Sequence, residues 1–289
     1  TYQAGKIYNT HNDATANGDR DAAIRVENGG TLILNSGIIE SQTGYTVAVI
    51  GQRDPGNWAT APINSTFIVN GGYQDAQEGG PAAFGNGAVI TVNGGVIEGR
   101  DNACLAGNGT VSGTSNDGGY TINMKGGTLI GRIISNGYVS CGIYHPNAGT
   151  VNMSGGTIIS TNGAGIVSRA GQTNITGGTI LALGNSGTTG MVGDSRVVVT
   201  TSGIVLDLAA GYAGAQTSAG KSENADIMIS GSPSISGTHS AIEVIENFAG
   251  TTVTEQDNVN LRGGVYSSPV DAEYLASGAA SASLNSAAY

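Results

Sequence analysis

The sequence is poor in charge, in aromatic rings and in cysteine, and each shortage excludes a class of function. Charged residues make up 11% of the 289 residues and aromatic residues 5%, and there are two cysteines and one tryptophan. With a net charge of −10 and no cluster of lysine or arginine, the chain has little that could displace the counterions of a nucleic acid. No apolar run reaches the length of about 18 residues that a membrane-spanning helix needs. We therefore expect neither nucleic-acid binding nor a membrane span.

Two cysteines are too few for a disulfide framework, and their spacing fits no metal-binding motif. Cys104 and Cys141 each open a predicted strand, one coil apart in the repeat described below. Stacked strands lie about 4.8 Å apart, which is within the reach of a disulfide. The sequence leaves two interpretations open: a pair of buried thiols that pack as small apolar side chains, or one bridge between neighbouring coils.

Familiar catalytic motifs are missing as well. The chain contains no G-x-S-x-G, no H-E-x-x-H, no Walker loop and no dinucleotide fingerprint. Its three histidines, His11, His145 and His239, lie far apart and show no metal-ligand spacing. We predict no catalytic residue from motifs, and an enzyme is the less favoured class.

Glycine, in contrast, is abundant, with 49 residues, while hydrophobic residues reach 39%. This composition is too apolar for a disordered glycine-rich linker, and the glycines lack the three-residue period of collagen. The other common residues are Val, Ile, Thr, Asn and Ser, which are typical of strands and tight turns. The composition therefore indicates an all-β chain with many sharp turns.

One pattern recurs nine times: an alternating strand, a glycine corner and a second short strand. The alternation has period two, as in Ile122 inward, Asn123 outward and Met124 inward, which is typical of a strand with one buried face. Paired glycines suit the corner because a backbone with positive φ is cheap only without a Cβ. The nine segments are 31–41, 66–76, 89–99, 121–131, 150–160, 172–182, 197–207, 226–236 and 258–268.

The shortest repeat, 22 residues from Gly156 to Gly178, is long enough for three short strands and three corners. A third strand is therefore expected upstream of each segment, and longer repeats carry loops in addition. The candidates are 22–27, 46–51, 81–85, 103–107, 141–145, 164–168, 189–193, 212–216 and 240–245.

Such repeats bury their apolar faces only by stacking on each other. We predict a single-stranded, right-handed parallel β-helix, a three-sided solenoid of about nine coils, over residues 22–268. Right-handed coiling follows from the usual chirality of parallel crossovers. Residues 1–21 are predicted to be an N-terminal cap or anchoring segment, and residues 269–289 an Ala/Ser-rich C-terminal tail or cap.

Three acidic residues form the best candidate for a metal site. Glu40, Asp75 and Glu98 each lie three residues after the second corner position in consecutive coils, so stacking would align them in an outward column. Like charges about 5 Å apart repel unless a cation compensates them. Arg100, Arg132 or a calcium ion could do so, since Ca²⁺ prefers carboxylate oxygens. The alternative is a set of separated, solvated carboxylates.

The longest insertion, residues 51–64, holds the only tryptophan and is the candidate glycan-binding site. Trp58 and Arg53 lie in this loop, and Tyr45 and Tyr73 lie near it in sequence. Exposed rings could stack on sugars, and the alternative is that Trp58 folds back to cover the flank of the solenoid.

Across roughly residues 22–268 the repeats resemble the pectin-lyase-like parallel β-helix proteins. More narrowly, the stretch GGVYSSPVDAEYLASG (263–278) is similar to repeats in β-helical surface proteins of gut bacteria and in head-fibre or decoration proteins of their phages. Lyases of the pectin-lyase-like group carry a calcium-binding acidic cluster with a catalytic Arg or Lys, and hydrolases of the group carry three aspartates. Here the acidic column lacks an adjacent lysine, and no coil shows paired aspartates.

The resemblance implies a non-enzymatic structural or adhesion protein on a virion or cell surface, such as a phage head fibre or capsid decoration protein with weak glycan binding. Its partners would be a capsid or other surface protein, bound through one terminus, and surface glycans. A calcium-dependent polysaccharide lyase or glycosidase is one alternative, and a bacterial adhesin or carbohydrate-binding module is another. We expect no cofactor apart from the calcium alternative, and a homotrimer stays open.

Overall fold

The computed structural model describes residues 5–10, 22–53, 61–76, 79–100, 102–107, 118–132, 141–147, 149–184, 201–207, 225–245 and 258–282. Over these ranges the chain forms three parallel sheets, which we name A, B and C. Sheet A contains β1 (Lys6–Asn9), β4 (Ile38–Ser41), β7 (Tyr73–Ala76), β10 (Val96–Gly99), β13 (Thr128–Gly131), β16 (Thr157–Ser160), β19 (Thr179–Ala182), β22 (Ser234–Gly237) and β25 (Val265–Tyr266).

Sheets B and C contain eight strands each. Sheet B is formed by β2 (Ile24–Val26), β5 (Val47–Ile50), β8 (Ala82–Phe84), β11 (Leu105–Gly107), β14 (Cys141–His145), β17 (Ala164–Ser168), β20 (Ile204–Asp207) and β23 (Ile242–Ile245). Sheet C is formed by β3 (Thr31–Leu34), β6 (Thr66–Val69), β9 (Val89–Val92), β12 (Tyr120–Met124), β15 (Gly149–Met153), β18 (Gly171–Ile175), β21 (Ala225–Ile229) and β24 (Asn258–Leu261).

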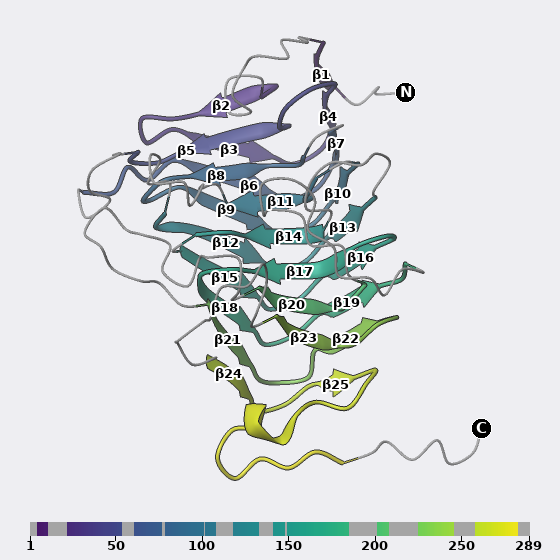
Figure 1. Ribbon diagram of the computed structural model, residues 1–289. Coiled ribbons are helices and arrows are strands. Elements are labelled where there is room, and N and C mark those ends of the chain that lie inside the picture. Colours follow the sequence, from purple (N-terminus) through teal and green to yellow (C-terminus); the bar gives the residue numbers. More distant parts are fainter. Residues whose placement is uncertain are drawn as a thin grey trace.

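The chain runs through sheets C, A and B in turn and then starts the next coil, as in β3, β4 and β5. Each strand pairs in parallel with the strand of the same sheet one coil further on, and the coils stack along one axis (Figure 1). This arrangement confirms a three-sided parallel β-helix of about eight to nine coils. The handedness of the coiling stays a prediction.

The core follows from the period-two alternation. Inward residues of successive sheet A strands, such as Ile97, Leu129 and Ile158, are completely buried, and so are Phe67 and Ile90 from sheet C. The residues between them point outward and are only partly buried. Each coil thus contributes a few apolar side chains to one continuous core along the axis of the solenoid.

Two observations show why the corners require glycine. Gly72, Gly95 and Gly127 have φ values of 86°, 82° and 78°, a backbone region that L-residues rarely adopt. A Cβ on Gly95 would also lie 2.8 Å from the carbonyl oxygen of Gly72 in the preceding coil. The coils therefore stack closely only because the corner has no side chain.

One of the nine predicted repeats is wrong. Residues 197–207 were expected to span a strand, a corner and a second strand, but Ile204–Asp207 form β20 of sheet B, between β17 and β23. Gly203 is preceded by Ser202, where most of the other corners have a first glycine, and its φ is not positive. The third strands predicted at 189–193 and 212–216 lie outside the described residues.

Sheet B departs from the simple inward and outward pattern because its outer face is also buried. Ala48, Ala82, Ala106 and Val167 point away from the main core, yet they are at most 3% exposed and form a second apolar cluster with Phe84. A strand that is buried on both faces is nearly continuously apolar, as the VAVI sequence of β5 is.

The two ends of the solenoid differ. At the N-terminal end, β1 adds one strand to sheet A ahead of residue 22, where the solenoid was predicted to begin. Its inward residue Ile7 is 49% exposed, whereas Ile39 in the next coil is 2% exposed. At the C-terminal end, residues 269–282 lie against the last coil. There a short 3₁₀ helix, η2 (Ala272–Tyr274), leads to Leu275, which bridges to Leu261. Within the described ranges, no helix is long and apolar enough to cross a membrane.

Cys104 and Cys141 are completely buried and form no disulfide, which confirms the interpretation as buried thiols. Burial raises the pKa of the Cys104 thiol to about 12 and also raises that of Cys141 well above its usual value. We expect iodoacetamide at pH 8 to label neither residue in the folded protein, because the thiolate is the reactive form. After unfolding without a reductant, mass spectrometry should find both residues alkylated, and a mass two hydrogens lower with no label would contradict this.

Candidate functional site

The acidic column predicted from the repeat is present on the outer face of sheet A. Glu40 pairs in register with Asp75, and Asp75 pairs with Glu98, on β4, β7 and β10. Ile39, Gln74 and Ile97, which precede them, point into the core. The three carboxylates therefore project outward from three adjacent strands.

Each carboxylate in the column forms an ion pair. The closest distance is 2.6 Å from the Lys6 Nζ atom to Glu40 and 2.5 Å from the Arg132 Nε atom to Glu98, and Arg100 binds Asp75 through two nitrogens. The carboxylate side chains are 12–26% exposed, whereas the three cations are 45–48% exposed. The arginine compensation is thus present, and Lys6 from β1 supplies a third cation that the sequence did not suggest.

Tyr73 belongs to the same cluster. Its hydroxyl group donates a hydrogen bond of 2.8 Å to Glu98 Oε2, and burial together with this bond raises its pKa well above the usual value. The phenol therefore stays protonated and holds Glu98 in place opposite Arg132. This bond uses the hydroxyl group and not the faces of the ring, so the predicted role of Tyr73 in stacking on a sugar stays a prediction.

The column offers little to a metal ion. No group of three or more His, Cys, Asp or Glu side chains in the described ranges is arranged to hold a metal. The carboxylate oxygens that calcium would need already bind lysine and arginine. As arranged in this structure, the cluster is a ladder of ion pairs along one flank of the solenoid.

We expect calcium to have no effect on stability. The melting temperature should be the same within error in millimolar calcium and in EDTA, since a ligand that does not bind the folded state cannot stabilise it. Replacing Glu98 with glutamine should cost about 1–3 kcal/mol, because it removes the charge that pairs with Arg132 and that accepts the hydrogen bond from Tyr73. A calcium-dependent rise in melting temperature that Glu98→Gln abolishes would contradict this account.

The four residues predicted to bind glycans do not form one site. Tyr45 and Arg53 both contact Phe84 on the outer face of sheet B. The ring centroids of Tyr45 and Phe84 are 5.7 Å apart, and the guanidinium carbon of Arg53 is 5.4 Å from the centroid of the Phe84 ring. Tyr73 lies on sheet A. Trp58 lies outside the described residues, so its role stays a prediction.

A buried histidine was missed in the sequence. His145 is completely buried, its Nδ1 atom lies 3.3 Å from Thr173 Oγ1, and its ring centroid is 5.6 Å from that of Tyr120. Burial lowers its pKa to about 4. The alternation along β14 could have placed it inside, because it lies two residues after the inward Ile143. The ring is therefore neutral near pH 7 and packs as part of the interior.

Near the C-terminal end, Ser202, Ser240, His239 and Glu243 form a second polar cluster that sequence motifs did not indicate. Ser202 donates a hydrogen bond of 2.6 Å to Glu243, and its oxygen lies 2.9 Å from that of Ser240. His239 Nε2 is 3.8 Å from Glu243 Oε1. A hydrolytic triad needs histidine between serine and acid. Here the acid lies in the middle and Ser202 is buried, so the cluster is structural.

Comparisons with known proteins found no match for this chain among protein-family models, among curated protein sequences or among solved structures.

Proposed function

We propose that this protein is a non-enzymatic structural rod displayed on a virion or cell surface, such as a phage head fibre or capsid decoration protein, with weak affinity for glycans. The observation that carries the proposal is the ion-paired column on sheet A. The acidic residues best placed for chemistry bind Lys6, Arg100 and Arg132 instead of facing an open site. A retaining or inverting glycosidase needs one carboxyl group free to give up a proton and one free to act as base or nucleophile.

Sheet C supports a structural role. Asn174 donates to Asn152, and Asn152 donates to Asn123, each at 3.0 Å, along the outer face of the sheet. A second amide ladder joins Asn93, Asn70 and Asn35 at the corner. These amides satisfy each other from coil to coil, so the ladders hold the coils in register. The similarity of residues 263–278 to repeats in phage and gut-bacterial surface proteins gives the proposal its biological setting.

Location is the direct test of this proposal. We expect antibodies against the protein to label the surface of intact virions, or of the cells that produce it, in immunogold electron microscopy. A proteomic survey of purified virions should detect it in multiple copies. Finding the protein only inside cells, with no surface label, would contradict the proposal.

The enzyme alternative can be tested separately. Incubation with pectate, alginate and other acidic polysaccharides should produce no rise in ultraviolet absorbance from unsaturated products and no new reducing ends, with or without calcium. A product signal that is lost in Asp75→Asn and Glu98→Gln would establish a lyase or glycosidase and overturn the non-enzymatic assignment.

A bacterial adhesin or carbohydrate-binding module is the second candidate. It is favoured by the contact of Tyr45 and Arg53 with Phe84, which places an aromatic ring and an exposed cation side by side on sheet B. Labelling restricted to bacterial cells, with none on virions, would favour this candidate over the phage protein.

A further inference from the structure

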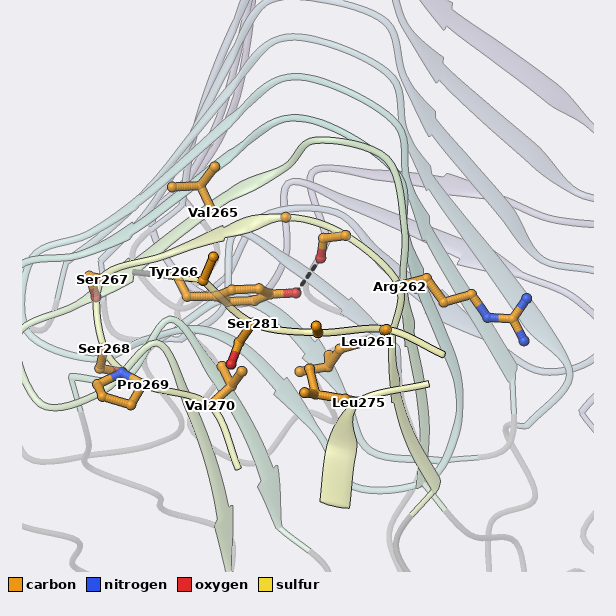
Figure 2. Close-up of a pocket in the computed structure, with 15 residues that line it drawn as sticks. Leu261, Arg262, Val265, Tyr266, Ser267, Ser268, Pro269, Val270, Leu275 and Ser281 are labelled. Carbon is orange, nitrogen blue, oxygen red and sulfur yellow. Dashed lines mark hydrogen bonds between the residues drawn. The ribbon is translucent and has the colours of Figure 1, made fainter. Parts of the chain in front are cut away.

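A cavity of about 570 Å³ lies at the C-terminal end of the solenoid, between the last coil and residues 269–282 (Figure 2). This volume is in the range of about 300–1,000 Å³ that is usual for small-molecule sites. The cavity is distant in sequence from the acidic column and from the loop that holds Trp58, and neither of those sites includes any residue that lines it.

Tyr266 forms one wall of the cavity because of its place in the repeat. It pairs in register with Ile235 and so continues the inward row of sheet A, and β25 is the last strand of this sheet in the described part of the chain. Its hydroxyl group donates a hydrogen bond of 2.6 Å to the carbonyl oxygen of Gly263, which fixes the ring. Figure 2 shows Val270, Leu275 and Ser281 on one side of that ring. The half-buried ring therefore offers an apolar surface to the cavity.

The opposite wall is made of small residues, and this explains why a cavity exists. Residues 279–282 read Ala-Ala-Ser-Ala and line it from the capping segment. These side chains are too short to reach Tyr266 and fill the space. The Ala/Ser-rich composition of the C-terminal segment thus leaves a pocket at the end of the solenoid where larger residues would close it.

The lining favours a neutral ligand with both apolar and polar faces. Val270, Leu275 and the ring of Tyr266 supply apolar contacts, while Ser268 and Ser281 supply hydroxyl groups. The Ser267 hydroxyl group also lines the cavity but is bound to the backbone of Gly237. Among the described residues that line the cavity, Arg262 alone is charged and none is a carboxylate, and the Nε atom of Arg262 donates to Asn260 at 3.0 Å. A lipid would leave the hydroxyl groups unused, and a multivalent anion would need more cations. A sugar ring has an apolar C–H face and a polar rim, which matches this lining.

We propose that this cavity is the glycan-binding site of the rod and that it takes a neutral mono- or disaccharide unit, with one sugar ring stacked on Tyr266. The inference rests on the proposed function, because it gives the expected glycan contact a place at the C-terminal tip. An aromatic ring with one apolar face exposed is the usual platform for a ligand of this kind.

The test is ligand-observed NMR with a panel of neutral hexoses and N-acetylhexosamines, followed by calorimetry of those that bind. We expect at least one saccharide to bind the wild type. Tyr266→Ala should weaken it about tenfold or more, as truncation of a central aromatic contact does. Tyr266→Phe keeps the ring and should stay close to the wild type. Ala280 is exposed, so Ala280→Trp should fill the cavity and remove binding without unfolding the chain.

Tyr8→Ala is the control, because Tyr8 is an exposed tyrosine on β1 at the other end of the solenoid, and this variant should bind as the wild type does. The inference is overturned if no saccharide of the panel binds, or if Ala280→Trp binds normally. It is also overturned if Tyr8→Ala loses binding while the Tyr266 variants keep it. Surface labelling tests the proposed function independently, so a rod found on virions without sugar binding refutes only this inference, and sugar binding without surface labelling refutes only the proposed function.

Discussion

Replacing Gly95 with alanine is expected to lower the free energy of unfolding by about 2–5 kcal/mol. The left-handed backbone at a φ of 82° costs an L-residue about 1–2 kcal/mol. The new Cβ would also lie 2.8 Å from the carbonyl oxygen of Gly72 and 2.9 Å from the carbonyl carbon of Gly71. Forcing a methyl group against a rigid backbone adds about 1–3 kcal/mol. Urea denaturation followed by circular dichroism measures the difference.

Gly29→Ala is the matched control. Gly29 has a similar φ of 78°, but a Cβ there would meet no atom within 4 Å. It should therefore show only the backbone cost of about 1–2 kcal/mol. The excess destabilisation in Gly95→Ala measures the contact between coils. Equal losses in the two variants would show that the corners of neighbouring coils do not touch.

Acid should destabilise the protein through His145. Burial lowers its pKa from 6.5 to about 4, so the unfolded chain binds a proton between these values more readily than the folded chain. The contribution of this group to the free energy of unfolding is full above pH 6.5. It falls as the pH drops below 6.5 and is constant again below pH 4. The loss at pH 4 is about 3 kcal/mol, at about 1.4 kcal/mol per pH unit. Thr173 and Tyr120 lie against the ring, and neither is charged near neutral pH.

Comparison with His145→Gln separates this effect from the titration of carboxylates. The variant lacks the imidazole, so its free energy of unfolding should fall less than that of the wild type between pH 7 and pH 4. The expected difference between the two falls is about 3 kcal/mol. The slope of unfolding free energy against pH, from denaturation at several pH values, gives the comparison directly. Parallel slopes for the wild type and the variant would mean that His145 is not buried in a neutral form.

The fold could be predicted because its repeat is regular. Paired glycines at the same place in six of the nine repeats, such as Gly94 and Gly95, indicate where the coils turn, and the alternation in Ile122, Asn123 and Met124 indicates which side is buried. The register of the acidic column followed from the same rule. The rule failed at 197–207, where one glycine after Thr201 and Ser202 imitates a corner without its conformation.

Contacts outside the repeat could not be predicted. Lys6 binds Glu40 from a strand that precedes the first repeat and has no glycine corner to mark it. The buried outer face of sheet B escaped because Ala48 and Val167 are consistent with either face of a strand. The cavity beside Tyr266 depends on how the capping segment returns to Leu261, and no local pattern encodes that return.

The central claim, that equivalent side chains of successive coils lie directly over each other, can be tested with engineered cysteines on the outer face of sheet A. Thr128 pairs in register with Thr157, and Thr157 pairs with Thr179. Adjacent strands are about 4.8 Å apart, which suits a disulfide, whereas strands two coils apart are about 9.6 Å from each other. Mild oxidation should therefore bridge Thr128→Cys with Thr157→Cys within one chain and leave Thr128→Cys with Thr179→Cys unbridged. No bridge in the first pair, or an equally fast bridge in the second, would contradict the stacked β-helix.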